Sequence, residues 1–386
     1  YYWIGAHVHH GWLRHLPTAE RMHWMVGSNP YAASAVIGLA GAWILLTMLI
    51  VLRPSRKVGA TATPADLDRL RQYLQSHHGN LLTHMLFTGD KSFFWSADGE
   101  VLIPYARSRD KLVVLGDPLG PEKLVPDALG EFLQMADTYA MSVVFYQATP
   151  GYLPMYHEFG YRFFKLGEEA LVHLDQFTLS GKKNTDLRTV RNRFEREGAV
   201  FEVVHPPFAP ELLRELRAVS DDWMHGRREK GFSLGWFDER YLQEAPIAVL
   251  RETGGSIFAF ASLAPAYDGG RTISIDLMRH RSQVPNGTMD YLFVQLLEWS
   301  KEQGYEIFNF GNAPLASVGE TRSALREEKL AALVFQYGGH WYGFKGLRKY
   351  KSKFSPEWEP RFLAYPASVS LPVLTVDLVR LVSRRV

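Results

Sequence analysis

A charge-free apolar run covers residues 31–52. A helix needs ~20 apolar residues to cross the ~30 Å core of a bilayer, so this run predicts a membrane-spanning helix. The alternative, a buried core helix, is usually shorter and amphipathic. Arg53, Arg56 and Lys57 follow at once, which favours a cytoplasmic location for everything after Leu52.

Beyond a linker of small residues and proline at 58–64, the hydrophobic pattern alternates between helical and strand periods. The first half predicts, in order, a helix at 65–77, a hairpin at 92–96 and 101–106, a strand at 111–115, a helix at 121–139, a strand at 142–147, a helix at 152–159 and a strand at 161–165. The second half predicts helices at 187–197 and 209–225, a hairpin at 247–251 and 256–264, a strand at 272–278, a helix at 288–303, a strand at 306–310 and a helix at 329–336.

The order of meander, glycine-containing turn, helix and strand therefore occurs twice. This order is typical of an α+β fold with mixed sheets and helices on the sheet faces. It is similar to a tandem of acetyltransferase-like (GNAT-type) domains. We predict an extracytoplasmic segment and spanning helix at 1–57, a first acetyltransferase-like domain at 58–175, and a second, catalytic one at 176–386. Because the chain begins with Tyr1 rather than Met, we expect a larger membrane domain to precede it.

Composition narrows the chemistry. The 386 residues include no cysteine, which excludes disulfides, thiolate metal sites and a cysteine nucleophile. The net charge is only +2, so affinity for nucleic acid would have to come from local basic patches. Walker, His-Glu-x-x-His and Gly-x-Ser-x-Gly motifs are all missing from the sequence, and we expect neither a cofactor nor a metal. Five histidines precede residue 24; a metal site is conceivable there, but an interfacial segment with aromatic anchors is the simpler interpretation.

An acidic residue beside basic ones ends the predicted strand at 272–278. Strict alternation would place Asp276 and Arg279 on opposite faces, whereas a bulge, a turn or a strand end would let them converge. Together they could act as a general base or bind an amine, with the guanidinium on a phosphate. The alternative is an ordinary surface salt-bridge cluster.

Two basic stretches could contact phosphates of RNA or lipid. The first is an amphipathic helix within 182–196, and the second, at 344–354, interleaves basic and aromatic residues. A basic face exposed to solvent is the alternative for the second stretch. A mixed charge cluster at 322–329 is typical of a solvated helix face. The candidate phosphate contacts are Arg188, Arg191, Arg193, Lys345, Arg348, Lys349, Lys351 and Lys353.

Dispersed motifs, in order along the chain, resemble those of the multiple peptide resistance factor family, the bacterial phosphatidylglycerol lysyltransferases and alanyltransferases. The residues that carry the resemblance lie at 116–120, 182–198, 276–279, 308–311 and 344–361. The resemblance covers about 66–361, and the predicted spanning helix before it also fits.

The resemblance implies a cytoplasmic synthase domain, behind a flippase domain, at the bacterial inner membrane. It implies transfer of a lysyl or alanyl group from aminoacyl-tRNA to the glycerol hydroxyl of phosphatidylglycerol. Such transfer makes the membrane less anionic and confers resistance to cationic antimicrobial peptides, a virulence trait. Which amino acid is carried stays open, as does homo-oligomerisation. A related transferase acting on a cell-wall precursor and a non-catalytic lipid- or RNA-binding module are the alternatives. The implied site residues are Asp276, Arg279, Glu327 (with Glu328 as a rival), Lys345 and Arg348.

Overall fold

The computed structural model describes residues 30–51, 59–314 and 344–383, apart from the side chains at 30–37, 49–51, 344 and 345. It divides into two compact units, Tyr1–Arg56 and Lys57–Val386. The first unit contains helix α2 (Pro30–Val51), which coincides with the predicted helix at 31–52. No helix in the described part of the chain has the length and apolarity needed to cross a membrane, so the predicted span is not confirmed.

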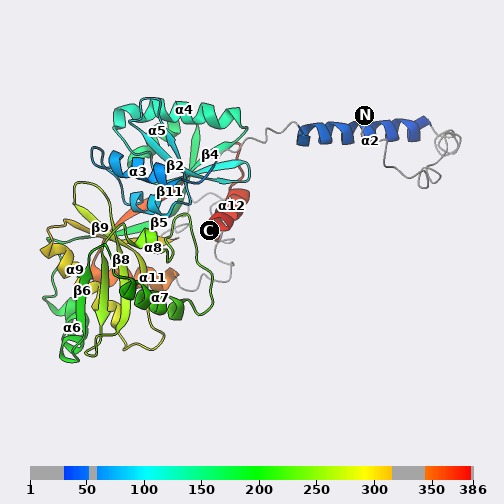
Figure 1. The fold of residues 1–386 in the computed structure, drawn as a ribbon. Coiled ribbons are helices and arrows are strands. Elements are labelled where there is room, and N and C mark those ends of the chain that lie inside the picture. Colours follow the sequence, from blue (N-terminus) through cyan, green and yellow to red (C-terminus); the bar gives the residue numbers. More distant parts are fainter. Residues whose placement is uncertain (1–29, 52–58, 315–343, 384–386) are drawn as a thin grey trace, which may run out of the picture. The chain divides into compact units, whose positions relative to one another are not determined.

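The second unit is built on one mixed eleven-stranded sheet with the order β1-β2-β3-β4-β11-β5-β10-β9-β8-β7-β6. Helices lie on both of its faces (Figure 1). The α+β fold class predicted from the sequence is therefore confirmed. The strands are β1 (Ser92–Trp95), β2 (Leu102–Ser108), β3 (Lys111–Leu115), β4 (Ser142–Ala148), β5 (Tyr161–His173), β6 (Val200–Val204), β7 (Ile247–Arg251), β8 (Ile257–Pro265), β9 (Thr272–His280), β10 (Ile307–Pro314) and β11 (Glu357–Pro366).

The helices follow amphipathic stretches of the sequence. Proline at the first or second position begins many of them, where its missing N–H costs nothing. The α-helices are α3 (Pro64–Tyr73), α4 (Val125–Thr138), α5 (Leu153–Glu158), α6 (Thr185–Arg196), α7 (Pro210–Met224), α8 (Glu239–Leu242), α9 (Thr288–Glu302), α11 (Phe344–Lys351) and α12 (Leu371–Val382). Short 3₁₀ helices are η2 (Thr83–Thr88), η3 (Glu122–Leu124), η4 (Pro150–Tyr152), η5 (Lys182–Asn184) and η7 (Ser352–Phe354).

Burial on both faces explains why the sequences of the central strands are apolar without interruption. On β3, Leu112 and Val114 pack against α4 and α5, whereas Val113 and Leu115 belong to the core beneath α3 and α12. A strand buried on both faces has no polar side and reads as a continuous apolar run. In the second half, β7 is likewise covered on one face by α6 and α9 and on the other by α7.

The two halves exchange their last strands. Strand β5 follows the first half in sequence but pairs with β10 of the second, and β11 follows the second half but pairs with β4 of the first. The two exchanged strands pair with each other at the centre of the sheet. Parallel pairing occurs once in each half, between β3 and β4 and between β9 and β10. The repeat predicted from the sequence is therefore present, and the boundary at 175/176 stays a prediction.

Candidate active site

Asp276 lies where β9 changes register against β8. The shift falls between Ala261 and Leu263, so that Asp276 and Leu277 both lie opposite Ser262. The backbone N–H of Leu277 donates to the Ser262 hydroxyl over 3.0 Å in place of a regular ladder bond. An extra residue in one strand re-aims the side chains around it. The bulge considered from the sequence is thus present at Asp276.

The carboxylate of Asp276 is held on both oxygens. The backbone N–H of Gly235 donates to Oδ1 over 3.0 Å, and the Tyr241 hydroxyl donates to Oδ2 over 2.7 Å. Burial raises the pKa of Asp276, and these two hydrogen bonds oppose the rise. A Cβ atom at position 235 would lie 1.6 Å from Oδ2, so the close approach requires glycine. The loop at 226–238 is therefore fitted to this carboxylate.

Lys91 brings a buried cation from the first half toward Asp276. Its side chain has no exposed surface, and its ammonium donates to the Met85 carbonyl (2.8 Å), the Thr88 hydroxyl (2.9 Å) and the Asp90 carboxylate (2.5 Å). Burial lowers the pKa of Lys91, whereas the charges of Asp90 and Asp276 raise it. The sequence analysis missed this residue because it precedes Asp276 by 185 positions and lies in no recognisable motif.

His84 and Tyr267 extend the same cluster. The His84 ring lies 5.1 Å from that of Tyr241, and its Nδ1 lies 2.9 Å from the Tyr267 hydroxyl. Complete burial lowers the pKa of His84 to about 3, so this imidazole is neutral at physiological pH. His84 and Tyr267 therefore extend the polar cluster that begins at Asp276 and Tyr241, with residues from both halves.

The guanidinium of Arg279 forms an ion pair with an acidic residue, Glu229. The guanidinium makes two 2.8 Å bonds to the carboxylate of Glu229 and also donates to the Ser220 hydroxyl. Glu229 in turn accepts from the backbone N–H of Phe237 over 3.3 Å. The side chain of Arg279 is 5 % exposed. Asp276 and Arg279 therefore converge on one structure, the 226–238 loop, which each of them binds at a different point.

Arg348 lies on α11, above the exchanged strands. Its guanidinium contacts the Glu168 carboxylate at 2.8 Å and stacks 4.8 Å from the ring centre of Trp358 on β11. Glu168 also accepts from Lys165 over 2.6 Å. About a third of the Arg348 side chain stays exposed.

Lys351, at the end of α11, points inward. Its ammonium donates to the carbonyls of Gly311 (3.0 Å) and Asn312 (2.9 Å). Burial lowers the pKa of Lys351 to about 8, against an opposing effect of the Glu169 charge. Lys351 therefore anchors α11 to β10, and its ammonium is not exposed for contact with a substrate phosphate.

A buried ion pair joins the exchanged strands below α11. Arg361 on β11 contacts Glu169 on β5 and also Glu359, at 2.9 Å from the latter. The amide of Asn309 on β10 donates to Glu169 over 2.9 Å. Arg361, Glu169 and Asn309 are each at most 3 % exposed, so this network fixes the register of three central strands.

The three arginines of α6 that were predicted to contact phosphate, Arg188, Arg191 and Arg193, all have protein partners. Arg188 donates to the carbonyls of Leu179 and Gly181, and Arg193 to that of Asn286. Arg191 binds the carboxylate of Glu298 at 3.0 Å, besides Glu195 on its own helix. The structure uses these side chains to hold α6 against its neighbours, and their contact with tRNA stays a prediction.

The remaining predicted residues divide into two groups. Glu327 and its rival Glu328 lie outside the described residues, and of Lys345 only the helical backbone is described. Lys349 is exposed on α11. Lys353 is 46 % exposed and contacts Asp290 at 3.0 Å. Among the predicted phosphate contacts whose side chains are described, Lys349 and Lys353 are thus the most exposed.

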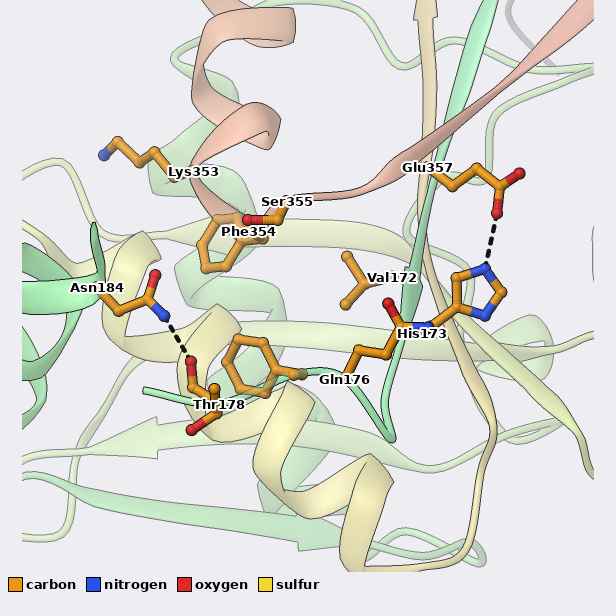
Figure 2. A pocket seen from close by; sticks show the side chains of 10 residues that line it. Val172, His173, Gln176, Thr178, Asn184, Lys353, Phe354, Ser355 and Glu357 are labelled. Atoms are coloured by element: carbon orange, nitrogen blue, oxygen red, sulfur yellow. Dashed lines mark hydrogen bonds and ion pairs between the residues drawn. The ribbon is translucent and has the colours of Figure 1, made fainter. Parts of the chain in front are cut away.

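A polar pocket of about 340 Å³ lies beside Lys353, between the end of β5 and the residues after α11 (Figure 2). A hydrogen bond of 2.8 Å between His173 Nε2 and the Glu357 carboxylate closes one side, and Asn184 donates to the Thr178 carbonyl on the other. The ammonium of Lys183 donates to the Ser355 hydroxyl at its edge over 2.7 Å. The pocket is separate from the Asp276 cluster in its residues.

The repeated meander, parallel pair and crossover helix define a tandem acetyltransferase-like protein, and the buried Asp276 cluster lies where its halves meet. Residues 70–365 match the family described as phosphatidylglycerol lysyltransferase, C-terminal. The chain belongs to this family, as the resemblance of the motifs predicted.

Similar proteins support the same assignment. L-PGS from Bacillus licheniformis is 48 % identical, with a TM-score of 0.76 over 86 % of this chain and 100 % of that one. The C-terminal domain of a protein named as a lysylphosphatidylglycerol synthetase of Agrobacterium fabrum is 36 % identical, with a TM-score of 0.75 over 83 % of this chain and 98 % of its own. Phosphatidylglycerol lysyltransferase of Bacillus subtilis is 44 % identical over 92 % of this chain. The chain spans only 41 % of that relative's length. FemX shares the fold alone, at 10 % identity and a TM-score of 0.51 over 83 % of this chain and 99 % of that one.

Proposed function

We propose that this chain is the synthase part of a phosphatidylglycerol lysyltransferase. It would transfer a lysyl group from lysyl-tRNA to the glycerol hydroxyl of phosphatidylglycerol. The observation that carries the proposal is that the chain covers the whole of the L-PGS structure at 48 % identity. The chain therefore aligns with the full length of the L-PGS structure.

The reaction is an exchange of esters. The lipid hydroxyl oxygen attacks the carbonyl carbon of the aminoacyl ester, a new ester bond forms, and the bond to the terminal ribose of the tRNA breaks. The proton of the lipid hydroxyl ends on that ribose oxygen. Because the aminoacyl ester is already activated, the protein needs chiefly to align the two substrates and to relay one proton.

Asp276 and Arg279 act, in this proposal, by holding the 226–238 loop in place. Each carboxylate oxygen of Asp276 has a further lone pair beyond the one used by Gly235 or Tyr241. The carboxylate can therefore also accept a hydrogen bond from the α-ammonium of the aminoacyl group. Glu327, by the family resemblance, is the second candidate for that contact or for the base.

The cations of α11 would receive the phosphates. Arg348 is about a third exposed, and Lys345 joins it by the family resemblance. Lys349 and Lys353 would contact the acceptor end of the tRNA. In the full-length protein we place this unit on the cytoplasmic side of the inner membrane, beside a flippase domain. Lysyl transfer would add positive charge to an anionic lipid and reduce the attraction of cationic antimicrobial peptides.

The test supplies the full chain, reconstituted in phosphatidylglycerol vesicles, with labelled lysyl-tRNA or alanyl-tRNA. We expect labelled lipid from lysyl-tRNA and little from alanyl-tRNA. The reverse preference would identify an alanyltransferase and would contradict the lysyl assignment. Absence of aminoacyl lipid from both tRNAs, with a folded protein by circular dichroism, would refute the transfer itself. Labelling of an added cell-wall precursor instead would favour the alternative transferase.

A further inference from the structure

One face of α12 exposes a stripe of valines. Val373, Val376 and Val379 are 48 %, 41 % and 46 % exposed. Residues three apart on a helix lie on the same face. Among the described residues after Gly59, only Val200 and Leu234 are other large apolar side chains with comparable exposure. The apolar surface of this unit is thus concentrated on a single helix.

The opposite face of α12 fixes this orientation. Leu371, Leu374 and Leu378 are at most 3 % exposed and belong to the core of the first half. Asp377 is fully buried and contacts Lys111 at 3.1 Å and Arg109 at 3.3 Å. A rotation that hid the valines would bring these leucines and this carboxylate to the surface, so the exposure is built into the fold.

Cations surround the stripe. Arg380 is exposed on α12, Arg107 is exposed near the end of β2, and Arg109 is exposed on the turn between β2 and β3, where it contacts Asp377. The acidic residue in that turn, Asp110, contacts Lys111 at 2.7 Å. In the sequence, the residues after Asp377 include three arginines and no acid. An apolar face flanked by arginines is the composition of a helix that lies in a membrane interface.

The chain also enters this unit near the same turn. A Cβ atom at Gly59 would lie 3.0 Å from that of Arg107, so Gly59 packs directly against the end of β2, next to this turn. In the sequence the charge-free run at 31–52 ends seven residues earlier. Gly59, the first described residue of this unit, therefore lies beside the segment that contacts α12.

We propose that the exposed face of α12 rests on a bilayer surface with anionic phospholipid headgroups. Val373, Val376 and Val379 enter the boundary between headgroups and acyl chains, and the arginines beside them meet the lipid phosphates. This deepens the proposed function, which requires a lipid substrate, by naming the surface through which the unit meets the bilayer.

Because the chain contains no cysteine, an introduced cysteine can be labelled at a single position, which allows a direct test. A single cysteine replaces Val376, and an environment-sensitive fluorophore is attached to it. The control is Val200→Cys, at a valine that is 52 % exposed on β6. The full-length chain is reconstituted in phosphatidylcholine vesicles with and without phosphatidylglycerol, and no tRNA is added. We expect emission at position 376 to shift to shorter wavelength and to be quenched by nitroxide-labelled lipid, more strongly with phosphatidylglycerol, with no such change at position 200.

Two outcomes would overturn the proposal. Solvent-like emission at position 376 in every vesicle would show that the face is not covered by lipid. A shift that appears in detergent alone and grows with protein concentration would show that a second copy of the chain covers it. Because no aminoacyl donor is present, either result is independent of whether the transfer reaction occurs. The second measurement uses an unlabelled triple variant, Val373→Asn with Val376→Asn and Val379→Asn. We expect its α12 to bind lipid more weakly than that of the parent protein. Vesicles should therefore protect the variant less than the parent from protease cleavage after Arg380.

Discussion

The backbone nitrogen of Gly235 lies 3.0 Å from Oδ1 of Asp276, and no side chain fits between them. A loop of the second half is thereby fixed to the carboxylate at the bulge of β9. The contact joins a residue that the sequence marks as functional to one that it does not, and it makes the conformation of the 226–238 loop a condition of the site.

Gly235→Ala should therefore disturb the site. The added Cβ would lie 1.6 Å from Oδ2 of Asp276, so the loop or the carboxylate must move. We expect a loss of at least tenfold in aminoacyl transfer and a loss of about 1–3 kcal/mol in the free energy of unfolding. Gly254→Ala is the matched control, because a Cβ there meets no atom within 4 Å. Equal activity of the two variants would contradict the close packing of loop and carboxylate.

Arg279 and Glu229 should behave as one unit in a double-mutant cycle. Removal of either partner leaves the other charge without its bidentate contact, at a cost of about 3 kcal/mol in stability. We expect the double variant Arg279→Ala with Glu229→Ala to lose about as much as each single variant. The control is the exposed pair of Arg271 and Glu306, where the same change should have little effect on stability because solvent screens the pair.

The activities of these variants separate two roles for Arg279. If it acts through the loop, Glu229→Ala should lower kcat as much as Arg279→Ala does, and Arg279→Lys should restore little because it cannot make the bidentate contact. A fully active Glu229→Ala beside an inactive Arg279→Ala of equal stability would instead show that Arg279 touches a substrate.

The local hydrophobic pattern predicted helices and strands correctly where the element is buried in a regular way, on both faces of a strand or along one face of a helix. The strand predicted at 111–115 is β3, because both of its faces are covered and its apolar run is bounded by turns. The helix predicted at 288–303 is α9 within a residue of its end. The strand exchange could not be predicted in this way. Strand β11 contains Pro360 and alternating charges, which do not indicate a central strand, and its buried Arg361 finds its partner, Glu169, only on the neighbouring strand β5.

The candidate site shows the same limit. Asp276 and Arg279 stand out in the sequence because an acidic and a basic residue occur together at the end of an apolar strand. Their partners Lys91, Tyr241 and Glu229 do not, because each lies in a loop or a short helix and is brought near only by tertiary packing. For the arginines of α6, the sequence cannot tell a guanidinium free for phosphate from one that satisfies a neighbouring carbonyl.

The pKa of Lys351 gives a pH-dependent stability. Burial lowers it from 10.5 in the unfolded chain to about 8 in the folded protein. Between pH 8 and 10.5 the unfolded state binds more protons, so stability rises with pH in this window, by up to about 3 kcal/mol. Urea unfolding at pH 8 and pH 10 should show this rise in the parent protein relative to Lys351→Met, which lacks the titrating group. The exposed Lys353→Met serves as control and should keep the parent's pH dependence; an unchanged slope in Lys351→Met would contradict the burial of this ammonium.

The salt dependence of tRNA binding should distinguish surface cations from structural ones. Each lysine or arginine that neutralises a phosphate of a single strand contributes about 0.7 to the slope of log K against log salt concentration. Lys349 is exposed on α11, so Lys349→Ala should weaken tRNA binding and reduce the slope by about that amount, with an unchanged melting temperature. Arg188 donates to the carbonyls of Leu179 and Gly181, so Arg188→Ala should lower stability by about 1 kcal/mol and leave the slope unchanged. Filter binding at several salt concentrations measures both slopes. A reduced slope for Arg188→Ala, with its stability intact, would show that α6 meets the RNA directly and that its carbonyl contacts give way when it does.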